Sequence, residues 1–231
     1  MGYDRTFVLS VGGSLIVPGD INVGFLKDFR EAIIEFLNSE EEKRRAIIVT
    51  GGGSTSRRYQ QAALNVVKAA DRDLDWIGIA ATKLNAHLVR TLFGELAEER
   101  VIDNPEERID SDKPVLIGSG YLPGCSSDKD AVLLAVTYGA ERVVNLTNVP
   151  FVYDKNPKEF PDANPIKKMT WEEFENKFGR GWKPGLHAPF DPVAAQTAKE
   201  HGIKVVVADG SDLSNLKKIL NGEDFEGTLL G

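Results

Sequence analysis

Residues 46–59, AIIVTGGGSTSRRY, join an apolar run to three consecutive glycines and then to two arginines. The run AIIVT has the length and β-branched content of a buried strand, and the residues after it are typical of a helix. Glycine at such a junction allows a tight turn, so that backbone N–H groups and a helix N-terminus can face an anion. A similar junction, TFVLSVGGS, stands at residues 6–14. Two junctions favour a site for two phosphorylated groups at the carboxyl edge of a parallel sheet.

Neither glycine junction has the pattern of the common nucleotide-binding loops. GGGSTS lacks the lysine of a P-loop, and VGGSLI does not have the G-x-G-x-x-G spacing. The sequence therefore disfavours a P-loop kinase and a dinucleotide enzyme.

Short β-branched runs alternate with helical patterns along the whole chain, which is typical of strands joined by crossover helices into a largely parallel sheet. We expect one α/β domain over residues 1–231, with an N-terminal part of about 120 residues and a C-terminal part after it. Strands are predicted at 6–11, 46–50, 113–119, 142–147, 203–208 and 226–230, and helices at 22–38, 54–69, 74–93, 127–138, within 169–178, and at 191–202 and 212–222. In the third helix, the apolar stripe is predicted to be Ile77, Ala81, Leu84 and Leu88.

Composition excludes several classes of protein. Among the 231 residues Cys125 is alone and there are three scattered histidines, which excludes an internal disulfide and a structural zinc site. A formal net charge of −7 argues against a nucleic-acid binder. No apolar run approaches the ~20 residues that span a membrane, and the first strand does not have the pattern of a signal peptide. We expect a cytoplasmic protein without a membrane partner.

Two charged groups follow the triple glycine. Arg57 lies in the first turns of its helix, where arginine opposes the helix dipole but suits a bidentate phosphate contact; Arg58 is expected to be a surface residue. Asp75 is either the N-cap of the third helix or an acceptor of hydrogen bonds from sugar hydroxyls.

The segment SSDKDAV, residues 126–132, enters a helix after a strand. Ser127 and Asp130 have the spacing of a capping box, which gives Asp130 a structural explanation but leaves Asp128 without one. Further along, Lys183 and Asp191 flank or occupy a Gly/Pro-rich loop, GRGWKPGLHAPF. Such loops are often functional, and a lysine there could neutralise a transferring phosphoryl group.

In their order along the chain, these motifs resemble the amino-acid kinase superfamily and, within it, the archaeal-type uridylate kinases. The resemblance rests on seven segments in register: VGGSLIVP, VTGGGSTSRRY, DLDWIGIAATKLNA, GSGYLPGCSSDKDAV, NLTNVPFVYDKNP, FDPVAAQTAKEHGIKVVV and EGTLL. It implies a three-layer αβα sandwich, commonly assembled as a homo-hexamer, that transfers the γ-phosphoryl of ATP to UMP with Mg²⁺.

The resemblance also implies roles for individual residues. Gly12, Gly13, Lys183 and Asp191 would be catalytic; Gly52, Gly53, Arg57, Asp75, Ser126, Ser127 and Asp128 would bind UMP; Ser14, Thr147, Asn148, Tyr153 and Asp154 would bind ATP. No protein metal ligand is expected, so Mg²⁺ would be bound with the nucleotide.

Three positions depart from the family pattern. Ser10 stands where many members have lysine, Pro150 and Phe151 replace an Asp-Gly pair, and serines replace threonines in SSDKDAV. With Ser10 in place of lysine, Lys183, Arg57 and Mg²⁺ would supply the positive charge. Two alternatives stay open: a superfamily kinase with another small acceptor, and a non-catalytic protein that binds or stores a nucleotide.

Overall fold

The computed structural model describes residues 3–38, 41–124, 126–157, 159–181 and 188–231. Its centre is a seven-stranded sheet in the order β3-β2-β1-β4-β8-β9-β7. All neighbouring strands are parallel except β8 and β9. The strands are β1 (Arg5–Val11), β2 (Arg44–Thr50), β3 (Val115–Gly118), β4 (Arg142–Thr147), β7 (Lys168–Met169), β8 (Lys204–Asp209) and β9 (Thr228–Leu230). A separate hairpin pairs β5 (Val152–Tyr153) with β6 (Pro165–Ile166).

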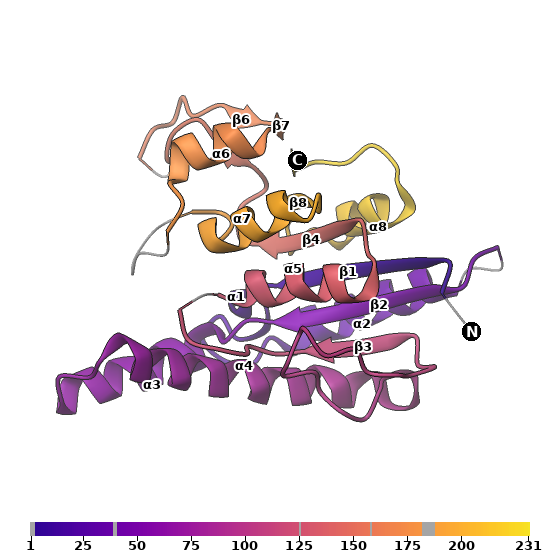
Figure 1. The fold of residues 1–231 in the computed structure, drawn as a ribbon, viewed down its shortest axis with the longest axis horizontal. Helices are drawn as coiled ribbons and strands as arrows, with labels where there is room; N and C mark the ends of the chain where they lie inside the picture. Colours follow the sequence, from indigo (N-terminus) through magenta and orange to yellow (C-terminus); the bar gives the residue numbers. More distant parts are fainter. Residues whose placement is uncertain (1–2, 39–40, 125, 158, 182–187) are drawn as a thin grey trace.

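Helices cover both faces of this sheet (Figure 1). One face carries α2 (Val23–Leu37), α4 (Asp71–Phe93) and α8 (Leu213–Asn221), and the other carries α5 (Ser127–Tyr138), α6 (Trp171–Phe178) and α7 (Pro192–Glu200). The helix α3 (Gly53–Val66) packs on α4 and extends past the carboxyl edge of the sheet, whereas α1 (Gly13–Ile16) and the 3₁₀ turn η1 (Gly94–Leu96) are short. The prediction of a three-layer α/β sandwich with a largely parallel sheet is confirmed.

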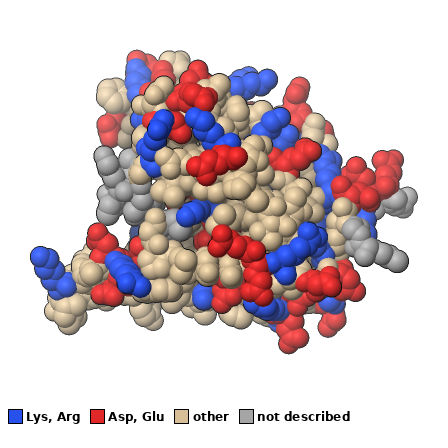
Figure 2. All heavy atoms as spheres, in the orientation of Figure 1, with Lys and Arg blue, Asp and Glu red and all other residues tan. Residues whose placement is uncertain are grey.

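The face of the molecule shown in Figure 2 carries charges of both signs. Lysines and arginines are interspersed there with aspartates and glutamates among uncharged residues. No helix in the described ranges is long and apolar enough to cross a membrane.

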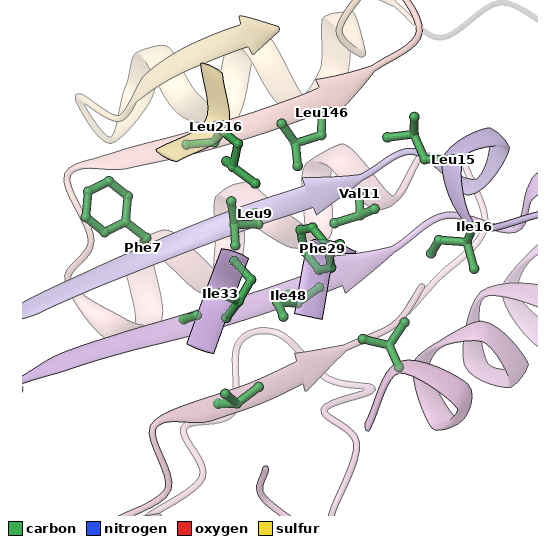
Figure 3. Close-up of a cluster of buried hydrophobic side chains, with 14 of the residues drawn as sticks. Phe7, Leu9, Val11, Leu15, Ile16, Phe29, Ile33, Ile48, Leu146 and Leu216 are labelled. Atoms are coloured by element: carbon green, nitrogen blue, oxygen red, sulfur yellow. The ribbon is translucent and has the colours of Figure 1, made fainter. Parts of the chain in front are cut away.

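The sheet forms two hydrophobic cores because its side chains alternate between faces. On β1, Leu9 packs with Phe29 and Ile33 of α2 in the first core, as Figure 3 shows, whereas its neighbour Val8 belongs to the second core with α5 and α7. Central parallel strands are buried on both faces, which explains why their sequences are almost continuously apolar. The two cores hold the carboxyl ends of β1, β2, β3 and β4 side by side.

The structure corrects the prediction for the third helix. It begins at Asp71, so Asp75 lies inside α4 and is not an N-cap; Ala70 holds that position. The predicted apolar stripe was wrong at Leu84, which is 63% exposed, whereas Ala81 is buried and Leu88 packs partly buried against the first core. The buried face also includes the polar side chains of Thr82 and Asn85, which apolar periodicity does not count. The sequence also gave no signal for α1, η1, β5, β6 or β7.

Candidate active site

The two glycine junctions lie against each other at the carboxyl edge of the sheet. A Cβ atom on Gly13 would be 2.0 Å from the backbone nitrogen of Gly53, and one on Gly51 would be 2.5 Å from that of Gly13. The Gly12 N–H donates to the Leu146 carbonyl, so this group is already used within the fold. Gly53 has a φ of +64° at the start of α3, a conformation that favours glycine. The glycines therefore allow two turns to touch and leave little but backbone at their junction.

A pocket of about 210 Å³ opens beside this glycine junction, and we call it the α4 pocket. Its floor and walls come from the starts of α3 and α4 and from the loop between β3 and α5. The lining residues are Gly52, Ser56, Gln60, Asp75, Gly78, Ile79, Thr82, Gly120, Tyr121, Leu122, Ser126, Ser127 and Asp130. Four predicted substrate-binding residues thus line one cavity: Gly52, Asp75, Ser126 and Ser127.

Hydrogen bonds fix the walls of the α4 pocket. The Thr82 hydroxyl accepts from the Gly120 N–H at 2.8 Å, and the Asp75 carboxylate accepts from the Gly124 N–H at 2.9 Å. The Gln60 side-chain amide donates to the Leu74 carbonyl at 2.9 Å, which links α3 to α4. These bonds tie both helices to the loop after β3, so the pocket has a defined shape without a ligand.

A chain of polar groups connects β1 with the starts of α5 and α7. The Ser10 hydroxyl donates to Asp128 Oδ1 at 2.8 Å, and the Asp191 N–H donates to Asp128 Oδ2 at 3.2 Å. Asp191 is the N-cap of α7, where it accepts from Val193, and its other oxygen accepts from both the N–H and the hydroxyl of Ser126 at 2.8 Å. Asp128 and Asp191 are therefore held together beside the carboxyl end of β1.

Ser10 has a specific place in this arrangement. It is 2% exposed on β1, and its hydroxyl donates to the Asp128 carboxylate. A hydroxyl satisfies one lone pair of Asp128 but brings no positive charge. Desolvation by burial therefore dominates and raises the pKa of Asp128 to about 6, and the charge of Asp191 adds to this increase.

The prediction of a capping box in SSDKDAV was wrong. The N-cap of α5 is Ser126, whose hydroxyl accepts from the Asp128 N–H, and Ser127 is the first helical residue. Asp130 therefore has no capping role. Its carboxylate is 3% exposed in the α4 pocket and accepts from the Tyr121 N–H at 3.3 Å. Burial raises the pKa of Asp130 to about 7.

A second pocket of about 680 Å³ lies beyond β4, and we call it the β5 pocket. Its lining residues are Thr147, Asn148, Val149, Phe151, Val152, Tyr153, Lys155, Asn156, Pro157, Glu159, Lys177, Phe178, Ala188 and Pro189. The rings of Phe151 and Tyr153 pack edge to face, with 6.3 Å between their centroids. The size, the aromatic wall and the two lysines suit a nucleotide that carries several phosphates.

Of the four predicted ATP-side residues from the end of β4 onward, three line this β5 pocket: Thr147, Asn148 and Tyr153. Asp154 points elsewhere, because its carboxylate accepts from the backbone and the side chain of Asn164 and closes the turn between β5 and β6. Hydrogen bonds from Asn164 also lower its pKa. Its role in the structure is to hold the hairpin.

The remaining predicted residues are less constrained. Ser14 is exposed on α1, and Arg57 is exposed on α3, one residue after Ser56 of the α4 pocket. Lys183 lies outside the described residues. Sequence reasoning missed Gln60, Thr82 and Tyr121 in one pocket and Lys155 and Lys177 in the other. Gln60 follows Ser56 by four residues, so helical periodicity could have placed both side chains on the same face of α3.

With this geometry in view, comparison with known proteins identifies the family. A family model described as "Amino acid kinase family" matches residues 5–209. The chain belongs to the amino acid kinase family. The uridylate kinase of Methanothermobacter thermautotrophicus is 31% identical over 94% of this chain and 95% of its own length. That of Methanospirillum hungatei is 33% identical over 97% of this chain and 94% of its own.

A solved structure of this amino acid kinase family agrees with the fold. The crystal structure of uridylate kinase from Archaeoglobus fulgidus superposes with a TM-score of 0.81 at 28% identity and covers 97% of this chain and 99% of its own. The similarity therefore extends over both pockets and the glycine junction between them.

Proposed function

We propose that this amino acid kinase family member transfers the γ-phosphoryl group of ATP to UMP and yields UDP and ADP. The observation that carries the proposal is a pair of pockets on either side of the glycine junction, one sized for a monophosphate and the other for a triphosphate. Full-length similarity to proteins named uridylate kinase supports UMP as the acceptor. It disfavours both a different acceptor and a storage role.

In this proposal the protein catalyses the transfer by aligning its two nucleotide substrates. The α4 pocket holds UMP, with Asp75 toward the ribose, Ser126 and Ser127 near the phosphate and Arg57 above it. The β5 pocket holds ATP between Tyr153 and the turn at Thr147 and Asn148. The glycine junction lets the two phosphates approach without a side chain between them, which in-line phosphoryl transfer requires.

The two carboxylates beside the carboxyl end of β1 position their neighbours. Asp191 fixes Ser126 and the start of α7, and Asp128 ties β1 to both helices. Within the described residues no cluster of three His, Cys, Asp or Glu side chains could hold a metal ion. Mg²⁺ would therefore be bound by the phosphates and would neutralise their charge, as magnesium commonly does in kinases. Lys183 stays a predicted source of further positive charge.

The test is an assay of ADP formation with UMP, CMP, AMP, glutamate and aspartate as acceptors. We expect turnover that depends on UMP and on Mg²⁺. A protein that forms ADP with another acceptor in preference to UMP contradicts the proposed substrate. Binding of ATP and UMP without turnover would instead favour the non-catalytic alternative.

We also propose that the protein is a homo-oligomer, as the family resemblance implies. The exposed faces of α3 and α4 carry large apolar side chains, with Tyr59 68%, Val66 82% and Leu84 63% exposed. Large apolar side chains exposed to this extent on two packed helices are suited to a contact with a second chain. Light scattering should give a mass near six times the 25.3 kDa of one chain, and Val66→Glu should reduce it. A monomeric wild-type protein would contradict the proposal.

A further inference from the structure

Asp130 is a buried carboxyl group in the α4 pocket to which the family resemblance assigns no role. It lies in the first turn of α5 and is 3% exposed. Its Oδ2 accepts from the Tyr121 N–H at 3.3 Å, and this is the one hydrogen bond that it forms with the described residues. A carboxyl group has room for several hydrogen bonds. Because Asp130 lines the α4 pocket, it can form a further hydrogen bond to a ligand there.

The charges around Asp130 are mostly negative. Asp128 on α5 and Asp191 at the start of α7 both oppose its ionisation, while Lys129 on α5 favours it. Asp75 of α4 lines the same pocket, and the described lining of this pocket contains no lysine or arginine. A nucleoside monophosphate is an anion, so an ionised Asp130 in the same pocket would repel it.

The neutral form of Asp130 does not repel an anionic nucleotide. Burial is the main cause that raises its pKa to about 7, so the protonated form is well populated near neutral pH. A neutral carboxylic acid can donate its O–H to an oxygen while it still accepts from Tyr121. The negative charge of the bound nucleotide then stabilises the protonated form of Asp130 further.

We propose that Asp130 binds the acceptor nucleotide as a neutral carboxylic acid that donates a hydrogen bond to an oxygen of the nucleotide. The inference rests on the proposed function, because it takes UMP as the occupant of the α4 pocket. The oxygen belongs to a base carbonyl or to the phosphate; both are hydrogen-bond acceptors. Asp130 thus makes acceptor affinity depend on pH.

Titration calorimetry of UMP into the full-length protein tests this inference. Between about pH 7 and pH 8.5 we expect the Kd for UMP to rise with a slope that approaches tenfold per pH unit, because only the protonated pocket binds. The phosphate of UMP, with a second pKa of about 6, stays a dianion over this range. Repeating the titration at about pH 8 in buffers of different ionisation enthalpy should show uptake of nearly one proton per UMP.

The Asp130→Asn variant separates ionisation from packing. Its amide can donate a hydrogen bond but does not titrate, so we expect a Kd that is independent of pH and no proton uptake. Asp73→Asn, at an exposed position on α4, is the matched control and should keep the wild-type slope. Uridine identifies the oxygen: the slope persists with uridine when Asp130 pairs with the base and disappears when it pairs with the phosphate.

Several results would overturn the inference. A wild-type Kd without pH dependence and without proton uptake contradicts it even if the Asp130→Asn protein does not fold. A folded Asp130→Asn protein that keeps the wild-type slope assigns the titration to another group. UMP that fails to bind at every pH overturns the proposed function and this inference with it, whereas UMP that binds equally at every pH overturns the inference alone.

Discussion

The α4 pocket and the β5 pocket face the same glycine junction but are built in different ways. The α4 pocket is small, at about 210 Å³, and stands on two long helices and the end of a buried strand. The β5 pocket, at about 680 Å³, is built mainly on loops and the two-residue strand β5, with the ends of β4 and α6 beside them, and its lining has aromatic rings and two lysines. Rigid elements position groups more accurately than loops do. The difference indicates that the first pocket selects by fixed hydrogen bonds, and the second holds its ligand through contact area and charge.

The junction between the pockets should be the least tolerant part of the molecule. In Gly13→Ala the new Cβ would lie 2.0 Å from the nitrogen and 2.6 Å from the Cα of Gly53, so one backbone must move. We expect a loss of about 3 kcal/mol or more in the free energy of unfolding, and loss of turnover. Chemical denaturation and the ADP assay measure both effects.

Gly19→Ala is the control for this substitution, since a Cβ there would meet nothing within 4 Å. Its stability should stay within about 0.5 kcal/mol of wild type. A Gly13→Ala protein with wild-type stability would mean that the two turns are not in contact.

The raised pKa of Asp130 in the α4 pocket should affect the free energy of unfolding as well as the binding of the acceptor. Asp130 has a native pKa of about 7, above the value near 3.9 of an unfolded aspartate, so the native state binds more protons between these pH values. Its contribution to stability is present below about pH 4 and is lost as pH rises through 7. The asparagine of the Asp130→Asn variant does not titrate, so the variant lacks this pH-dependent contribution.

Relative to wild type, Asp130→Asn should therefore gain about 2–3 kcal/mol in unfolding free energy between about pH 5 and pH 8. Denaturation of both proteins at the two pH values measures the difference. An equal difference at both would show that Asp130 is ionised in the folded protein throughout the range.

The fold was largely predictable, because it depends on patterns that are local in sequence. The β-branched runs that became β1, β2, β4 and β8 and the N-cap at Asp191 all stand out in the chain. Buried polar positions were not predictable in this way. Thr82 and Asn85 interrupt the apolar pattern of α4, and their burial depends on partners far along the chain, such as Gly120 and Gly51.

The site was predicted less completely for the same reason. The glycine junctions were found because glycine is a strong local signal, but their contact with each other is a tertiary property. Asp130 was misassigned because its spacing from Ser127 matched a capping box, whereas the chain enters α5 one residue earlier. Asp154 sits in a motif of the ATP side, yet only the fold of the hairpin shows that it bonds to Asn164.

In the β5 pocket, removing one aromatic ring should weaken one substrate only. Tyr153→Ala takes away a side chain that lines the pocket and packs on Phe151. We expect the KM for ATP to rise about tenfold, consistent with the loss of one ring contact, with no change in the KM for UMP. Phe160→Ala removes a 46% exposed ring that is outside the pocket lining but has its centroid 5.5 Å from the Nζ atom of Lys155, so it should raise the KM for ATP less than Tyr153→Ala does and leave the KM for UMP unchanged. An increase in the KM for UMP would mean that the two pockets do not act separately.

The smallest effect concerns the two arginines of α3, which are adjacent and both exposed. Adjacent residues on a helix point about 100° apart, so only one of them can lean over the α4 pocket. Arg57 follows Ser56, a residue of that pocket, and we expect Arg57→Ala to raise the KM for UMP about threefold to tenfold, as loss of a solvent-exposed charged hydrogen bond would. Arg58→Ala removes the same charge from the same helix and should change the KM by less than about twofold. Equal effects of the two variants would reduce the role of Arg57 to general attraction of an anion, and a larger effect of Arg58→Ala would move the phosphate contact to that residue.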